Sequence, residues 1–382
     1  MFDFKEQIKK DREFIDGVWE KLDKKMSVVA VRSREKCPYT SKDGEHVNHR
    51  SGDITWWTNG FWGGLMWLMY VGTKNDVYKI SAERNEELLD EALAQYFKLH
   101  HDVGFMWHIT AGVNYAVTGN EKSRIRNMFA ASTLASRYNA NGKFIKAWNE
   151  EPAVTIIDCM MNIPLLYWAS RETEDPRFKQ IAMNHADTTI KNHIRDDGSV
   201  KHICEYDSET GECTGHRAGQ GYGLDSSWSR GQSWALHGFA LSYIHTGKKE
   251  YLDIAKKVAH YFISCVCEDY APKADFRAPD EPLIYDTSAS AIAAAGLLEI
   301  AKNVSPLEGQ IYYNAAMNLI KVLDERFANY TLDDDSVLGM ASERWTDKEE
   351  AFGKGAHVPL IWGDYYYVEA IYKLKGFELL FE

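Results

Sequence analysis

The sequence predicts an all-α fold made of repeated helical hairpins, and three observations support this. Short joins recur along the chain, and Gly72, Gly119 and Gly247 stand where a helix often ends in left-handed backbone. Equivalent joins are separated by about 50 residues or somewhat more, a period that fits two helices and two loops. The first helix of each pair is apolar on almost every side, whereas the second is amphipathic. A buried helix therefore alternates with a helix that covers it.

Each hairpin contributes one inner and one outer helix. The amphipathic spacing i, i+3, i+4, i+7 is clear at Leu89, Ala92, Leu93 and Tyr96. We expect the N-terminal helix, about 4–26, to act as the sixth outer member. The inner helices are expected near 59–72, 105–118, 155–171, 230–246, 287–302 and 361–375. An (α/α)6 barrel with six inner and six outer helices is the closed solution to this pattern, and an open solenoid is the alternative.

Two intervals between joins are too long for a hairpin and must contain inserts. The first insert, residues 196–227, includes a stretch at 199–206 that alternates like a strand and is followed by glycine-rich turns, which predicts a small β-hairpin. The second insert is expected at about 329–357. Residues 333–335 within it are three consecutive aspartates, which we interpret as a solvated loop. We predict one catalytic domain over residues 1–382.

The composition excludes several classes of function. With 382 residues, 45% hydrophobic and 26% charged, the chain resembles an ordinary globular protein. A net charge of −12 argues against binding nucleic acid or an anionic membrane. No stretch approaches the roughly 20 apolar residues of a membrane span, and the N-terminus has no secretory pattern, so we expect a cytoplasmic monomer or homodimer. The cysteines and histidines show no metal-site spacing, and we expect reduced thiols, no metal and no cofactor.

Two aspartates suggest acid–base chemistry. Asp102 follows His101, and Asp158 stands among apolar residues, each near an expected helix start. A carboxylate among apolar neighbours loses water, which disfavours its charged form and allows it to hold and donate a proton near neutral pH. The alternative is that both aspartates only cap helices.

The predicted barrel brings these aspartates together. Because the inner helices run parallel, their starts meet at one mouth. Tryptophans and an arginine lie beside those helix starts. Helix capping requires neither residue type, so their presence favours a binding site over simple caps. The expected result is a sugar-sized pocket with aromatic walls, two carboxylates and one cation. Its segments are 56–62, 101–102, 158, 228–234, 286–290 and 362–367.

Five motifs in order resemble glycoside hydrolase family 88, the unsaturated glucuronyl hydrolases. They are Trp57-Thr-Asn-Gly-Phe-Trp62, His101-Asp-Val-Gly-Phe105, Ile157-Asp-Cys-Met-Met-Asn-Ile-Pro164, Arg230-Gly-Gln-Ser-Trp234 and Trp362-Gly-Asp-Tyr-Tyr366. The resemblance implies an (α/α)6 barrel acting on glycosaminoglycan-type disaccharides or oligosaccharides whose terminal uronate carries a C4=C5 double bond. It implies Asp158 as the acid and base and Asp102 as the second essential carboxylate. It also implies pocket positions at Trp57, Asn59, His101, Trp148, His202, Gln220, Arg230 and Trp234.

The implied reaction is consistent with this chemistry. Protonation of C4 of the vinyl ether produces a cation at C5, which water then attacks, so one carboxyl group can serve as acid and then as base. A charge on Asp102 would raise the proton affinity of Asp158, and Arg230 or His202 could offset the substrate carboxylate.

Other functions remain open on the sequence alone. An unsaturated rhamnogalacturonyl hydrolase would use the same chemistry on pectin fragments. A sugar 2-epimerase on the same barrel would use paired histidines such as His101 and His108, and a non-catalytic sugar-binding barrel is a further alternative. Relatives that act on sulfated fragments carry hydroxyl groups and a lysine before the last inner helix, whereas residues 352–358 contain no serine.

Overall fold

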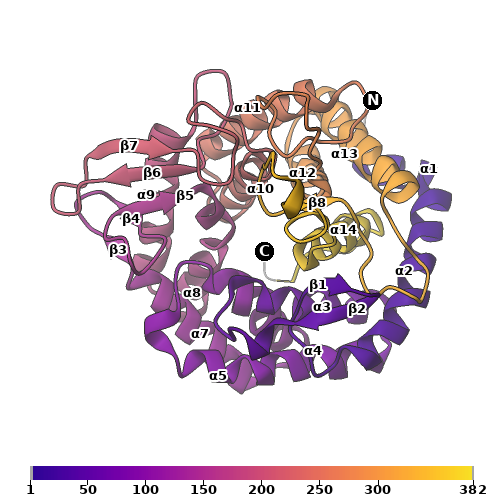
Figure 1. Ribbon diagram of the computed structural model, residues 1–382. Coiled ribbons are helices and arrows are strands. Elements are labelled where there is room, and N and C mark those ends of the chain that lie inside the picture. Colours follow the sequence, from indigo (N-terminus) through magenta and orange to yellow (C-terminus); the bar gives the residue numbers. More distant parts are fainter. Residues whose placement is uncertain (1–2, 381–382) are drawn as a thin grey trace.

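Two concentric layers of helices form a closed ring in the computed structural model, which describes residues 3–380 (Figure 1). The inner layer consists of α3 (Phe61–Thr73), the π-helical segment η4 (Gly104–Gly112) continued by α6 (Val113–Thr118), α8 (Pro164–Thr173), α10 (Ser229–Thr246), α12 (Thr287–Asn303) and α14 (Ile361–Leu374). The outer layer consists of α2 (Arg12–Arg32), α4 (Asp76–Leu88), α7 (Glu121–Ala135), α9 (Pro176–His193), α11 (Lys249–Val266) and α13 (Pro306–Arg326).

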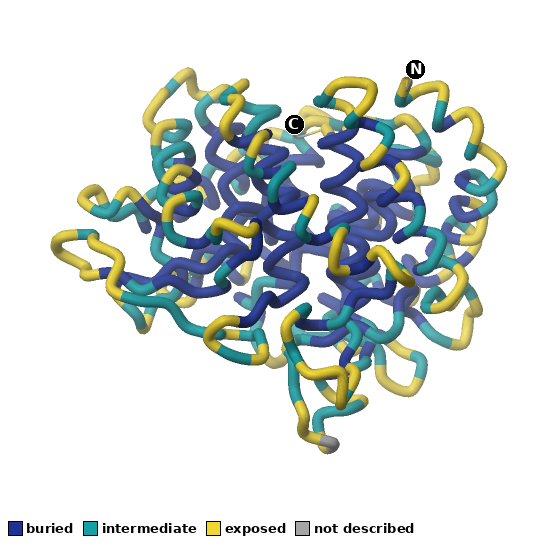
Figure 2. Tube along the Cα trace, turned by 90° about the horizontal axis from the view of Figure 1, so that it is seen from above, coloured by how far each residue is buried: buried dark blue, intermediate teal, exposed yellow. Residues whose placement is uncertain are grey.

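The last inner helix packs against the first. Consecutive inner segments contact one another around the ring, and α14 returns to pack on α3. This closure confirms the (α/α)6 barrel and excludes the open solenoid. Figure 2 shows that the buried residues occupy the middle of the molecule and the exposed ones its periphery. None of the helices in the described range 3–380 is both long enough and apolar enough to cross a membrane.

Helix ends follow the expected chemistry at two of three glycines. Gly119 and Gly247 adopt positive φ angles of 71° and 69° immediately after α6 and α10. The expectation for Gly72 is wrong, because α3 continues to Thr73 and Lys74 takes the left-handed position with φ 60°. Gly72 instead allows close packing: a Cβ atom there would lie 2.4 Å from the Trp19 ring.

The inner helix expected at 155–171 is divided into three parts. Residues Val154–Ile156 form strand β5, Ile157–Met161 form the 3-10 turn η5, and α8 begins only at Pro164. The run of β-branched residues before Asp158 suits a strand as well as a helix, and pairing with the first insert favours the strand. Asp158 therefore lies on a 3-10 turn directly after a strand.

Both inserts carry short antiparallel strands. In the first insert, β6 (Ile203–Tyr206) pairs with β5 and with β7 (Cys213–Arg217), and β6 and β7 project from the ring in Figure 1. In the second insert, β8 (Ala341–Ser342) pairs with β9 (Ala356–Val358). The remaining sheets are β1 (Pro38–Lys42) with β2 (Glu45–Asn48), and β3 (Tyr138–Asn139) with β4 (Phe144–Ile145).

The remaining helical elements are short connections. They are α1 (Phe4–Lys10), α5 (Asp90–Leu93), η1 (His49–Ser51), η2 (Trp57–Gly60), η3 (Tyr96–Lys98) and η6 (Glu349–Ala351).

The aspartates at 333–335 do not form a uniformly solvated loop. Asp335 is fully buried, with one carboxylate oxygen 2.5 Å from Arg32 Nε and the other accepting the backbone N–H of His46 at 2.8 Å. The second insert is thereby tied to α2. A run of acidic residues in the sequence does not reveal which member is buried with a cation.

Candidate active site

A cavity of about 650 Å3 opens where the inner segments begin. Seven of the ten predicted site residues line it, namely Trp57, Asp102, Trp148, Asp158, His202, Gln220 and Arg230. They come from η2, the turn just before η4, the connection between β4 and β5, the turn η5, the first insert and α10. Five of the six segments expected at the mouth therefore contribute to this cavity, whereas the segment 286–290 does not line it and instead supplies Asp286, which pairs with Arg230.

Asp102 is held from behind by Asn162. The Asn162 side-chain amide donates to Asp102 Oδ1 at 2.9 Å and to the backbone carbonyl of Asp158 at 3.3 Å. Its own oxygen accepts the backbone N–H of Phe105 at 2.9 Å. One buried amide therefore fixes the start of η4, the Asp102 carboxyl group and the turn that carries Asp158. Asn162 was quoted within a motif but was not among the predicted site residues.

The surroundings of Asp102 favour its protonated form. Burial, and next the charge of Asp158, raise the pKa of Asp102 well above its usual range, although the Asn162 hydrogen bond lowers it. Burial also lowers the pKa of His100 to about 4 and that of His101 well below its ordinary value. Sequence reasoning placed the raised proton affinity at Asp158, whereas the structure assigns a raised pKa to Asp102.

Asp158 and His202 face each other in the lining of the cavity. The two side chains are mostly buried, and His202 Nε2 lies 3.4 Å from Asp158 Oδ2. His202 Nδ1 accepts the backbone N–H of Gln220 at 3.0 Å, so a neutral imidazole carries its proton on Nε2, toward Asp158. Gly219 makes this approach possible: its φ is 63°, and a Cβ atom there would lie 2.1 Å from His202 Nδ1.

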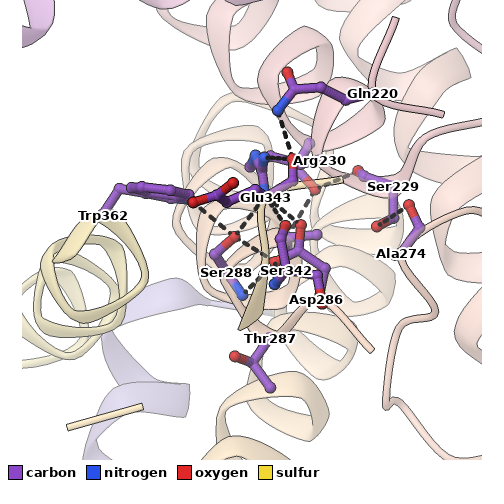
Figure 3. A network of polar contacts seen from close by, with 12 residues as sticks. Gln220, Ser229, Arg230, Ala274, Asp286, Thr287, Ser288, Ser342, Glu343 and Trp362 are labelled. Carbon is purple, nitrogen blue, oxygen red and sulfur yellow. Dashed lines mark hydrogen bonds and ion pairs between the residues drawn. The ribbon is translucent and has the colours of Figure 1, made fainter. Parts of the chain in front are cut away.

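Arg230 anchors the second insert to the barrel (Figure 3). Its guanidinium lies 2.5 Å from Asp286 Oδ2 and donates to the backbone carbonyls of Ser342 at 2.7 Å and Glu343 at 2.6 Å. It also lies over the rings of Trp228 and Trp362. The charge of Arg230 is therefore balanced by Asp286 and largely enclosed by protein. That Arg230 also contacts a substrate carboxylate stays a prediction.

Gln220 reinforces the same junction. Its side-chain amide donates to the Glu343 backbone carbonyl at 2.5 Å, and the Gln220 backbone carbonyl accepts the backbone N–H of Trp345 at 2.9 Å. The two inserts, far apart in sequence, together build one wall of the cavity.

Three predicted site residues are buried behind the cavity wall. Asn59 donates to the backbone carbonyls of Asp53 and Ile54, both at 3.0 Å. Trp234 is fully buried, with its ring 5.3 Å from those of Phe105 and Tyr366. His101 is also fully buried, and its Nε2 lies 3.4 Å from Asp102 Oδ2.

Sequence reasoning missed a group of residues at the cavity mouth. Tyr39 lies beside the cavity and donates a hydrogen bond to Glu343, and Arg344 and Lys98 are exposed cations on its rim. The further lining residues outside the predicted set include Asp53, Thr55, Trp56, Phe97, His100, Asn149, Glu150 and Trp362. Trp362 had a signal, since it belongs to a quoted motif, and its ring lies 4.9 Å from that of Trp57. Trp56 also had a signal, because it belongs to the expected mouth segment 56–62. Tyr39 lies on β1, Phe97 and Lys98 lie on η3, and the rest lie in loops, where no periodic pattern marks them.

The comparison with known proteins is consistent across sequence and structure. The model of Glycosyl Hydrolase Family 88 matches residues 29–326. The unsaturated glucuronyl hydrolase of Bacillus sp. (strain GL1) is 35% identical over 353 residues, covering 89% of this chain and 91% of that protein. The unsaturated chondroitin disaccharide hydrolase of Streptococcus pneumoniae is 36% identical over 330 residues, covering 84% and 82%.

Solved structures agree with this assignment. The crystal structure of the Bacillus sp. GL1 unsaturated glucuronyl hydrolase has a TM-score of 0.86 at 32% identity and covers 94% of this chain and 97% of its own. A mutant of the Streptococcus agalactiae unsaturated glucuronyl hydrolase complexed with dGlcA-GalNAc6S has a TM-score of 0.80 at 29% identity, covering 96% and 93%. The chain is a glycoside hydrolase and belongs to glycosyl hydrolase family 88.

Proposed function

We propose that this enzyme is an unsaturated glucuronyl hydrolase, which adds water across the C4=C5 vinyl ether of a terminal unsaturated uronate. The observation that carries the proposal is the pair Asp102 and Asp158 on one cavity with aromatic walls, in a chain of this family. Enol ethers are protonated at carbon, and the resulting cation at C5 is stabilised by the ring oxygen. The reaction therefore needs a proton donor and a water, and no nucleophile at the anomeric carbon.

In the proposed mechanism Asp158 delivers the proton to C4 and then accepts a proton from the attacking water. Asp158 lines the cavity, and its buried Oδ2 atom, which faces His202 Nε2 at 3.4 Å, is in no hydrogen bond within residues 3–380. Water forms a bond to C5, and the resulting hemiketal opens by breaking the bond between C5 and the ring oxygen, which leaves a ketone at C5 and a hemiacetal at C1. That hemiacetal then collapses to an aldehyde and releases the remaining sugar as an alcohol. The proton taken from water restores Asp158, so the cycle balances with one water consumed.

Asp102 and His202 act around that step. Burial and the charge of Asp158 raise the pKa of Asp102, so this carboxyl group holds its proton more tightly than a free aspartate does, and a proton is kept beside Asp158. The Nε2 proton of His202 can stabilise Asp158 after it has given up its own proton. Both residues therefore tune a proton transfer made by Asp158.

The histidine pair expected for the epimerase alternative, His101 and His108, does not share one pocket. His108 does not line this cavity; it contributes to a second, small cavity lined also by Met161, His237 and Glu369. His101 is fully buried behind Asp102. Proton exchange on a shared sugar requires both imidazoles in one pocket. The related rhamnogalacturonyl hydrolase is less favoured, because the relatives described above are glucuronyl and chondroitin disaccharide hydrolases.

For the substrate we propose a disaccharide or short oligosaccharide of the glycosaminoglycan type. Exposed Lys98 and Arg344 on the cavity rim suit an anionic sugar, and Phe97, 90% exposed, offers a flat face for a sugar ring. The segment 352–358 supplies Lys354 without a serine, so we do not include a requirement for sulfate.

Isotope labelling tests the reaction. Turnover in D2O should place deuterium at C4 of the released keto-uronate, and turnover in oxygen-18 water should first label C5. The conjugated enol ether should disappear from the ultraviolet spectrum, and the saturated glucuronide should be inert. Heavy oxygen at C1 before C5, or efficient cleavage of the saturated compound, would instead indicate a conventional two-carboxylate glycosidase.

A further inference from the structure

The contiguous residues His100, His101 and Asp102 bring three metal-ligating atoms together at the cavity wall. Within residues 3–380 they form the group of three or more His, Cys, Asp or Glu residues whose ligand atoms all lie within 4.8 Å of one another. His100 Nδ1 lies 3.3 Å and His101 Nε2 lies 3.4 Å from Asp102 Oδ2. A sequence search for spaced ligands passes over such a contiguous triplet.

These separations match the edges of a zinc coordination shell. Ligand atoms 2.0–2.1 Å from a tetrahedral Zn2+ are about 3.3 Å apart. Two of the three edges already have this length, and the third, between His100 Nδ1 and His101 Nε2, is no longer than 4.8 Å. Two imidazoles and one carboxylate are a normal zinc ligand set, with water in the open fourth position.

The ligand atoms are also available. His101 is fully buried, and neither of its ring nitrogens has a hydrogen-bond partner in the described part of the chain. Asp102 uses Oδ1 for Asn162 and leaves Oδ2 toward the two histidines. His100 Nδ1 accepts a long contact of 3.4 Å from the Asp102 backbone N–H, so it carries a lone pair that is only weakly engaged.

We propose that His100, His101 and Asp102 form a zinc-binding site that switches the hydrolase off. A metal on Asp102 Oδ2 would withdraw that carboxylate from its role beside Asp158 and occupy the cavity wall that His100 and Asp102 line. Zinc inhibition is therefore reversible and competes with substrate. The binding part stands on geometry alone, and only the inhibition rests on the proposed function.

Calorimetry with ZnCl2 tests binding without any substrate. The titrations use a background in which the exposed Cys213, Cys265 and Cys267 are replaced by serine, because free thiols bind zinc themselves. One equivalent of zinc should bind per chain. Since loss of outer-shell partners alone can weaken a metal site 10–100-fold, His100→Ala should raise Kd by at least about tenfold. Tetrahedral Co2+ bands should appear in the background protein and weaken in His100→Ala, whereas Mg2+ should not compete.

His216→Ala is the matched control, because His216 lies on β7 outside the cavity-lining set. Zinc affinity should be unchanged in it. Inhibition constants are then compared after normalising each variant to its own rate, with chelator restoring activity. Equal zinc affinity in the background protein and His100→Ala, or inhibition that does not depend on His100, would overturn the proposal. Zinc binding that depends on His100, in a protein that leaves the vinyl ether intact, would support the site and refute the proposed function.

Discussion

At the residue scale, Asp158 is predicted to be indispensable for chemistry and dispensable for folding. Asp158→Asn keeps the size of the side chain but has no proton to deliver, so kcat should fall by about 10² to 10⁴-fold with a normal melting temperature. Steady-state assays on a lyase-generated disaccharide would measure this. Retention of more than about a tenth of the wild-type rate would remove Asp158 from the acid role.

Asp102 should show a cost in stability that depends on pH. Burial raises its pKa in the folded protein, so the folded state binds this proton more tightly than the unfolded state does. The stability contributed by that proton is present in acid and is lost as pH rises from the ordinary aspartate pKa through the raised value. Asp102→Asn lacks this titration, and its melting temperature relative to wild type should rise as the pH is increased. A pH-independent difference between the two proteins would contradict the argument.

At the scale of elements, Arg230 should matter most for assembly of the cavity wall. Arg230→Ala leaves Asp286 buried without its cation and frees the carbonyls of Ser342 and Glu343, so we expect a loss of about 3–5 kcal/mol in unfolding free energy. Denaturant titration measures this. Adding Asp286→Asn to Arg230→Ala should recover part of the loss, because the unpaired charge is removed. A raised KM without destabilisation would indicate that substrate binding is the main role of Arg230.

The elements also show where sequence reasoning succeeded. The repeat and the change from apolar to amphipathic helices predicted a ring of six inner and six outer helices. The amphipathic run from Leu89 to Tyr96 was wrongly assigned, because the outer helix α4 ends at Leu88 and the run is divided between the short helix α5 and the turn η3. The turn at Asp158 was missed, because a short run of β-branched residues suits either a helix or a strand until its pairing partner is known. Glu343 and Arg344 were missed because the second insert has no periodicity, and its position depends on Arg230. The pairing of Arg230 with Asp286 could not be predicted either, because the two residues are far apart in the sequence and meet only in the folded chain.

At the scale of the whole molecule, the ring has the catalytic cavity at one end and a cluster of buried charged residues toward the other. Trp362 lies at the cavity, and Lys373, near the other end of the same helix α14, lies 2.8 Å from Glu369 and 3.1 Å from Glu299 on α12. This cluster links two neighbouring inner helices far along the barrel from the mouth.

Lys373→Met should therefore lower stability without changing the reaction. Two buried glutamates would lose a shared cation, and breaking a buried ion pair costs about 3–5 kcal/mol. Thermal unfolding should show the loss, while kcat and KM per folded molecule should stay at the wild-type values. A changed KM at temperatures where the variant is folded would mean that the two ends of the ring are coupled.

The anchor at Arg230 has a consequence for how the enzyme can diversify. Arg230 donates hydrogen bonds to two backbone carbonyls of the second insert. Backbone carbonyls are present whatever side chains occupy positions 342 and 343. The segment from 343 to 357 can thus exchange its side chains while its backbone stays docked. Exchanging residues 343–357 between two relatives should transfer the preference for the sugar that follows the uronate. The rate of proton transfer by Asp158 should stay the same. The barrel would then keep the catalytic residues unchanged, while segment 343–357 determines which sugar is accepted next to the uronate.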